Sequence, residues 1–168
     1  MMRPITRNKV IVIPYVYINA PMFMLFKDTQ SGDWTFVTGG CKMNETAYES
    51  AARELYEESR STLSISNMDI KSYFTFVSRF RPPEHAKNDI RRREIVTTTY
   101  HVYVAKTSVS DDYRQIYLQA KNNVKDTRKE FTETNDVVFA TLSDLQTNKY
   151  KMWDFIYDEV VPRLTKKI

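Results

Sequence analysis

The stretch from Thr38 to Ser59, TGGCKMNETAYESAARELYEES, concentrates acidic residues after a pair of glycines. Glu54, Glu57 and Glu58 are three and four positions apart, so on an α-helix their carboxylates project from one side. Like charges at this spacing destabilise a helix by about 0.2–0.5 kcal/mol per pair. A hard divalent cation such as Mg²⁺ or Mn²⁺ removes that repulsion and prefers carboxylate and carbonyl oxygens. The pattern predicts a metal site, the alternative being a solvated helix face.

Two neighbouring features fit the same site. Gly39 and Gly40 precede the helix, and a glycine turn lets backbone carbonyls approach an ion closely because no Cβ stands in the way. Arg53 directly precedes Glu54, where it either orients the carboxylates or forms a surface ion pair. We expect the turn and the helix to form one site.

These residues resemble a known family motif. The segment resembles the Nudix box, G-x5-E-x7-R-E-U-x-E-E-x-G-U, in which U is aliphatic. The matching positions are Gly39, Glu45 after five intervening residues, and RELYEE after seven more. The preceding WTFVTGG resembles the Trp-aromatic-Pro-Gly-Gly entry of that family, without its proline. Arg60 and Ser61 stand where the family has glycine and an aliphatic residue. A non-glycine residue adopts the left-handed conformation at a cost of about 1 kcal/mol, so we expect the helix exit to be redrawn.

The resemblance implies an α+β fold, the Nudix-type α/β/α sandwich with a mixed β-sheet, over a single domain spanning residues 1–168. It also implies Mg²⁺- or Mn²⁺-dependent hydrolysis of phosphoric anhydride bonds in a nucleoside diphosphate linked to another group, X. The residues it implies for the site are metal ligands Glu54, Glu57, Glu58 and the Gly39 carbonyl, with Arg53 orienting the glutamates and Glu45 supporting the loop. The general base stays open among Glu54, Glu57, Glu58 and a later glutamate, for which Glu133 fits best and Glu130 second.

The pattern of the remaining chain predicts the elements that position this site. β-branched and aromatic residues predict one or two short strands in 8–20, interrupted at Pro14, and further strands in 22–28, 34–37, 71–80, 95–105 and 136–142. Helical spacing predicts a helix capped by Asn44, an amphipathic helix in 113–124, and a helix in 148–164. Strands and helices mix without regular βαβ alternation, which favours an α+β or α/β/α layered domain.

Composition excludes several classes of protein. Hydrophobic residues make up 42% of the 168 residues and charged residues 27%, which is typical of a folded globular protein. The single cysteine, Cys41, excludes an internal disulfide framework and has no histidine nearby in sequence to activate it as a nucleophile. The longest apolar run, VIVIPYVYI, is too short to span a bilayer. We therefore expect an intracellular, cytoplasmic protein that does not enter the membrane.

A basic loop connects the two strands predicted in 71–105. Together with a net charge of +4, it predicts either a soluble hairpin or a clamp for a polyanion. Its basic residues are Arg79, Arg81, Lys87, Arg91, Arg92 and Arg93. We expect His85 and His101 to be structural, and Trp34 and Trp153 to be core residues, with base stacking as the alternative.

The spacing from Phe36 to Glu58 aligns without a gap on two Nudix branches, the mRNA-decapping enzymes and the diphosphoinositol-polyphosphate phosphohydrolases. Substrates of both are strongly anionic, which suits the arginine-rich loop. Capped RNA is therefore the first substrate expected, followed by dinucleoside and diphosphoinositol polyphosphates. The alternative from another class is a non-catalytic RNA-binding Nudix module.

Overall fold

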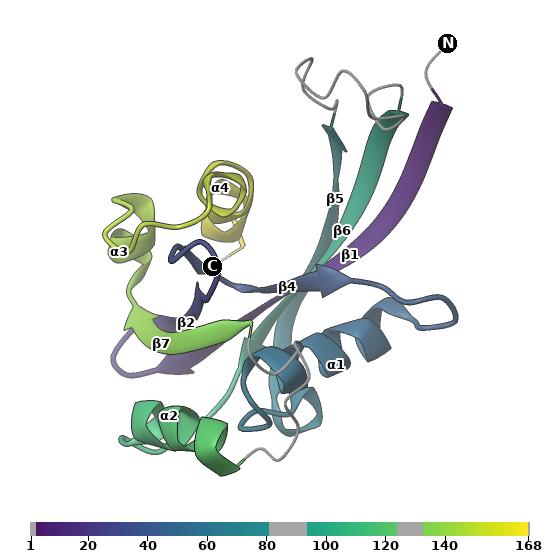
Figure 1. Cartoon of the computed structure of the whole chain (residues 1–168). Helices are drawn as coiled ribbons and strands as arrows, with labels where there is room; N and C mark the ends of the chain where they lie inside the picture. Colours follow the sequence, from purple (N-terminus) through teal and green to yellow (C-terminus); the bar gives the residue numbers. More distant parts are fainter. Residues whose placement is uncertain (1–2, 81–93, 124–132, 168) are drawn as a thin grey trace.

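The computed structural model describes residues 3–80, 94–123 and 133–167, which form a mixed seven-stranded sheet with helices on both faces (Figure 1). The strands are β1 (Arg3–Tyr17), β2 (Pro21–Asp28), β3 (Trp34–Thr35), β4 (Val37–Gly40), β5 (Asp69–Phe80), β6 (Glu94–Lys106) and β7 (Thr134–Ala140). The α-helices are α1 (Ala47–Glu58), α2 (Tyr113–Asn123), α3 (Leu142–Gln146) and α4 (Val161–Thr165). The predicted α+β class with a mixed sheet is confirmed.

Strand β1 organises the sheet. It runs parallel to β6 from Arg3 to Tyr15, and it is antiparallel to β4 near its middle and to β2 at its end. β5 pairs with the far side of β6, while β3 and β7 pair with β2. Because β4 pairs with β1, Gly39 and Gly40, the last two residues of β4, are fixed beside this strand.

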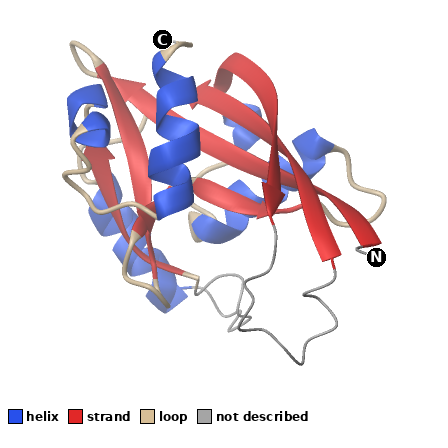
Figure 2. Cartoon of the chain, turned by 90° about the horizontal axis from the view of Figure 1, so that it is seen from above, coloured by secondary structure: helices blue, strands red, loops and turns tan. Residues whose placement is uncertain are grey.

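Two hydrophobic cores lie on opposite faces of this sheet. Ala51 and Leu55 of α1 pack with Tyr113 and Tyr117 of α2 against one face. The C-terminal segment, including Leu164, packs against the other face and lies over the strands in Figure 2. This is the predicted layered arrangement. Among the described residues, no helix combines the length and apolar character needed to cross a membrane.

The N-terminal strand is continuous, so the predicted interruption at Pro14 is wrong. β1 pairs with β4 at Lys9–Val12 and with β2 at Tyr15–Tyr17, and Pro14 lies between these two pairings. Proline lacks the N–H that a ladder hydrogen bond needs. Its position between two partner strands lets β1 continue through it, while the parallel pairing with β6 includes Pro14 itself.

Helix α1 begins later than predicted. Thr46, not Asn44, is the N-cap: its hydroxyl accepts from the Glu49 backbone N–H at 3.1 Å, and the Glu49 carboxylate accepts from the Thr46 N–H at 3.2 Å. This reciprocal capping box satisfies two backbone donors at once, whereas a single asparagine cap would satisfy one. Asn44 instead lies in the connecting loop, with a φ of 69°.

The C-terminal helical segment also begins later than the predicted 148–164. The chain at Lys151–Trp153 lies beside β3, where the Trp34 N–H donates to Lys151 O at 2.8 Å and the Trp153 N–H donates to Trp34 O at 3.0 Å. Those strand-like bonds delay the helix, which contains one π-helical turn at Ile156–Val160 before α4. Helix α3 was not predicted. Trp34 and Trp153 are partly buried against the core.

Candidate active site

Helix α1 places its glutamates beside strands β1 and β4. Because Ala51 and Leu55 anchor one stripe of the helix in the core, Glu54 and Glu58 on the adjoining stripe are carried inward with them. The exposed fractions of Glu54 and Glu58 are 8% and 5%, while Glu57 is half-buried. A solvated helix face is therefore the wrong interpretation of this acidic cluster.

Gly39 allows Glu54 to occupy its position. A Cβ added to Gly39 would overlap the Glu54 carboxylate, whereas a Cβ added to Gly40 would meet nothing within 4 Å. The first glycine is thus required by close approach of a carboxylate to the backbone, and the second is not. This contact brings the glycine pair and the helix together, as predicted. The predicted glycine turn is wrong, however, because Gly39 and Gly40 continue strand β4 and pair with Val10 and Lys9 of β1.

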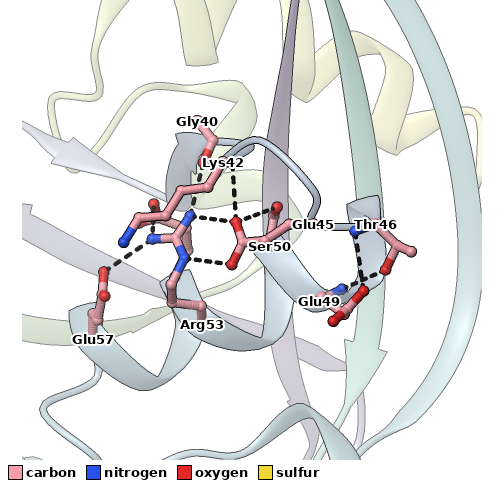
Figure 3. A network of polar contacts seen from close by, with 9 residues as sticks. Gly40, Lys42, Glu45, Thr46, Glu49, Ser50, Arg53 and Glu57 are labelled. Carbon is pink, nitrogen blue, oxygen red and sulfur yellow. Dashed lines mark hydrogen bonds and ion pairs between the residues drawn. The ribbon is translucent and has the colours of Figure 1, made fainter.

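Arg53 lies at the centre of a polar network that connects the loop to the helix (Figure 3). Its Nε donates to Glu45 Oε2 at 2.9 Å and its Nη2 donates to Glu45 Oε1 at 3.1 Å, a bidentate pair. Nη2 also donates to Gly40 O at 2.9 Å, and Nη1 donates to Glu54 Oε1 at 2.8 Å and to Glu57 Oε2 at 3.3 Å. The hydrogen bonds from Arg53 lower the pKa of Glu45 to about 2.

Glu54 and Glu58 are two buried carboxylates that interact with each other. Burial raises the pKa of Glu58 well above its usual range, and the charges of Glu54 and Glu133 raise it further. Burial also raises the pKa of Glu54, against the opposing effect of Arg53. Glu58 Oε2 has no hydrogen-bond partner among the described residues. Since buried polar atoms are nearly always paired, this oxygen marks a place where a ligand is expected.

The donor set fits a hard divalent cation. The buried carboxylates of Glu54 and Glu58, including the unpartnered Oε2 of Glu58, supply the anionic oxygen ligands that Mg²⁺ and Mn²⁺ prefer. Within the described part of the chain, however, no three acidic, histidine or cysteine side chains already converge as a metal cluster. The ion pair with Arg53 holds Glu57 at 3.3 Å, so Glu57 would join the metal only by turning from Arg53.

Glu133 is the later glutamate that the structure brings to this site. It directly precedes β7, its carbonyl accepts from the Thr29 N–H at 2.9 Å, and its charge acts on Glu58. The second choice, Glu130, lies outside the described residues. Family resemblance made Glu133 the first choice because it precedes the predicted late strand, whereas its approach to α1 depends on how β7 pairs with β2.

Arg79, the one predicted clamp residue that the structure describes, does not lie at these carboxylates. Arg79 lies near the outer end of β5, which is separated from β4 by β1 and β6 and therefore by three strand spacings of about 4.8 Å each. The remaining predicted residues of the clamp, Arg81, Arg91, Arg92 and Arg93, lie outside the described residues, as do His85 and Lys87. His101 is structural as expected: it bonds to Tyr73 OH at 2.8 Å and to Asn8 Oδ1 at 3.1 Å.

The exit of α1 keeps the left-handed conformation without a glycine, so the expectation of a redrawn exit is wrong. Arg60 and Ser61 have φ values of 55° and 67°. The Ser61 N–H donates to Tyr56 O at 2.8 Å and the Arg60 N–H donates to Glu57 O at 3.1 Å, which is the Schellman pattern of hydrogen bonds. Arg60 is itself buried, a feature that sequence reasoning missed.

Comparison with known proteins establishes the family. The model of the NUDIX domain matches residues 17–164, so the chain belongs to the Nudix family. Its members generally use divalent metal ions, and membership makes this chain a hydrolase of pyrophosphate bonds. No curated protein matches the chain.

Solved structures of Nudix proteins share the fold at low identity. A C. elegans Ap4A hydrolase is 15% identical, with 96% of this chain and 97% of that chain covered and a TM-score of 0.57. The E. coli dihydroneopterin triphosphate pyrophosphohydrolase is 13% identical, with 98% and 99% covered and a TM-score of 0.56. The Nudix hydrolase RenU of M. smegmatis is 10% identical, with 95% and 84% covered and a TM-score of 0.60.

The two glycines provide a matched pair of substitutions. Gly39→Ala displaces the Glu54 carboxylate because the new methyl group occupies its place, and we expect metal-dependent turnover to fall by about 100-fold. Gly40→Ala meets open space and is expected to retain turnover within about twofold. Steady-state kinetics at saturating Mg²⁺ compares them. Equal losses in the two variants would show that contact with Glu54 is not what requires glycine.

The buried carboxylates predict how stability depends on pH and metal. Unfolded glutamates ionise near pH 4.5, whereas the folded Glu54–Glu58 pair resists ionisation. The metal-free protein therefore loses stability as pH rises from about 4.5 through the raised pKa values. A cation that neutralises the pair should raise Tm more at pH 8 than at pH 6.

Thermal unfolding in EDTA and in excess Mn²⁺ measures this difference. Glu58→Gln should reduce it, because the variant loses the carboxylate with the most strongly raised pKa. A metal-induced shift in Tm that is the same at both pH values would contradict the account.

Proposed function

We propose that Glu54 and Glu58, joined by Glu57, hold Mg²⁺ or Mn²⁺ for hydrolysis of a nucleoside diphosphate linked to a second group, X. The observation that carries this proposal is the buried carboxylate pair with its unpartnered Glu58 Oε2. The Gly39 carbonyl is proposed as a further ligand, since its residue already lies against Glu54. A bound cation would neutralise the pyrophosphate oxygens and lower the pKa of the attacking water.

The protein's own residues supply the remaining steps. The water oxygen attacks phosphorus, the P–O bond of the anhydride breaks, and the leaving phosphate carries away the electron pair. We propose Glu133 as the base that accepts the water proton, because it approaches the site from a different segment than the three helix glutamates. Arg53 orients Glu54 and Glu57 and ties their helix to the Gly40 carbonyl.

A groove beside the end of β4 supports a strongly anionic substrate. Its volume is about 950 Å³ and its lining comprises Thr6, Arg7, Asn8, Lys9, Gly40, Cys41, Lys42, Met43, Glu45, Ala47 and His101. Arg7, Lys9 and Lys42 contribute positive charge, while the acid in the lining, Glu45, is already paired with Arg53. We propose that phosphates of X enter this groove, where basic side chains complement their charge.

The groove suits capped RNA, dinucleoside polyphosphates and diphosphoinositol polyphosphates alike, because all present chains or clusters of phosphate. The preference for capped RNA rests on the spacing of the motif and on a basic loop of which only Arg79 is described. A non-catalytic RNA-binding module is the weaker alternative. Binding alone has no need for two buried carboxylates that repel each other, which cost stability unless a cation joins them.

A substrate panel tests the reaction class. Capped RNA, dinucleoside polyphosphates, ADP-ribose, nucleoside triphosphates and diphosphoinositol phosphates are incubated with wild type and with Glu58→Gln at several Mg²⁺ and Mn²⁺ concentrations. We expect at least one substrate to be cleaved at a pyrophosphate bond, and Glu58→Gln to lower kcat by about 1,000-fold. Glu49→Gln on the same helix is the control, because glutamine also completes a capping box. Turnover unaffected by Glu58→Gln would refute the carboxylate mechanism.

Charge removal in the groove tests the proposed substrate site. Arg7→Gln and Lys42→Gln should each raise KM for the cleaved polyanion by about three- to tenfold, with kcat little changed. Each removes an interaction that stabilises the bound substrate and the transition state equally. Lys151→Gln is the control, since this exposed lysine pairs with Asp33. An unchanged KM in both groove variants would place the phosphates of X elsewhere.

A further inference from the structure

Arg60 is a buried cation at the end of the catalytic helix. Its exposed fraction is 3%, and its guanidinium lies 4.4 Å from the centroid of the Tyr117 ring. Nη2 donates to Thr134 O at 2.7 Å and Nη1 donates to Tyr117 O at 3.4 Å. One side chain thus connects the end of α1 with α2 and with the first residue of β7.

This arrangement carries two local costs. A non-glycine residue at φ 55° costs about 1–2 kcal/mol. Burying a cation costs several kcal/mol more before its contacts are counted, and Nε has no hydrogen-bond partner among the described residues. Glycine would avoid both costs and end the helix equally well. What glycine would not provide is the contact with Tyr117 and Thr134.

Thr134 is the point where these contacts meet. Its hydroxyl donates to Glu58 O at 2.7 Å, and because that proton is used, the Tyr117 hydroxyl donates to Thr134 Oγ1 at 2.6 Å. The Thr134 carbonyl meanwhile accepts from Arg60. The hydroxyl and the carbonyl of Thr134 are therefore both bonded to the end of α1, and the hydroxyl is also bonded to Tyr117. The residue before it in the chain is Glu133.

We propose that Arg60 is a positioning residue, which fixes the Glu133–Thr134 segment against the end of α1 so that Glu133 and Glu58 face the same reacting phosphate. This inference rests on the proposed function, because it assigns the purpose of the contact to hydrolysis. Arg60 itself is buried behind the carboxylates and acts through Thr134. Its position coincides with a departure from the Nudix box, so the arrangement is a property of this chain's own residues.

Arg60→Gly separates the two roles that the residue combines. The variant relieves the left-handed strain and the buried charge, so a role limited to ending the helix predicts an equal or higher Tm and unchanged kinetics. The positioning role predicts that kcat falls by about tenfold or more while KM stays within about twofold. Ser61→Gly is the matched control: it relieves the neighbouring positive φ of 67° and is expected to leave kcat unchanged.

Thr134→Val gives a second, independent test. It removes the hydroxyl that bonds to Glu58 O but keeps the backbone carbonyl, and we expect kcat to fall by about fivefold at constant KM. Because Arg60 and Thr134 act on one segment, the double variant should be little worse than Arg60→Gly alone. Fully additive losses would overturn the shared role.

Mn²⁺ binding to the wild type and Arg60→Gly, followed by electron paramagnetic resonance of the metal alone, provides a readout other than activity. We expect binding to weaken by about threefold or more, because Thr134, which bonds to Glu58 O, is no longer held by Arg60. If the wild type cleaves a substrate and Arg60→Gly matches it in kcat and in Mn²⁺ binding, the inference fails while the proposed function stands. If the wild type cleaves nothing, the proposed function fails, and unchanged Mn²⁺ binding would then overturn the inference also.

Discussion

Repulsion between two buried carboxylates is the constraint on which the site depends. Glu54 and Glu58 lie one helical turn apart and are nearly inaccessible to water. A single buried charge is costly, and two neighbouring buried charges of the same sign are more costly still. Protonation relieves this conflict at low pH, and a divalent cation relieves it at neutral pH. We propose that a fold which keeps both carboxylates buried gains stability from a bound cation, in keeping with the divalent metal ions that members of the Nudix family generally use.

Contacts in the surrounding structure hold the two carboxylates in place despite their repulsion. The apolar stripe of α1 anchors the helix to the sheet, and β1 fixes the two glycines by pairing with β4. Arg53 joins the helix to Glu45 and to the Gly40 carbonyl by charge-assisted hydrogen bonds, and Gly39 leaves room for Glu54. At the other end of the helix, Arg60 joins it to Thr134. The energy for positioning comes from contacts outside the pair itself.

Local patterns predicted the parts of the site that one segment supplies. The spacing of Glu54, Glu57 and Glu58 correctly indicated a helix that meets the preceding glycines, because helical geometry converts spacing directly into a shared face. The glycines themselves continue strand β4 instead of forming the predicted turn, because they pair with β1. The strand pair β5–β6 and the strand β7 were predicted from their β-branched and aromatic residues. Assigning Asn44 as the cap failed because a reciprocal pair outcompetes a single side chain. The buried role of Arg60 depends on Tyr117 and Thr134, far away in sequence, and no periodicity encodes such contacts.

Anomalous diffraction from crystals grown with Mn²⁺ tests the central claim most directly. The account predicts an anomalous peak about 2.2 Å from carboxylate oxygens of both Glu54 and Glu58, with Glu57 turned from Arg53 toward the ion. A crystal grown at neutral pH in saturating Mn²⁺ that shows no peak between these side chains, with both carboxylates buried as they are here, would contradict it.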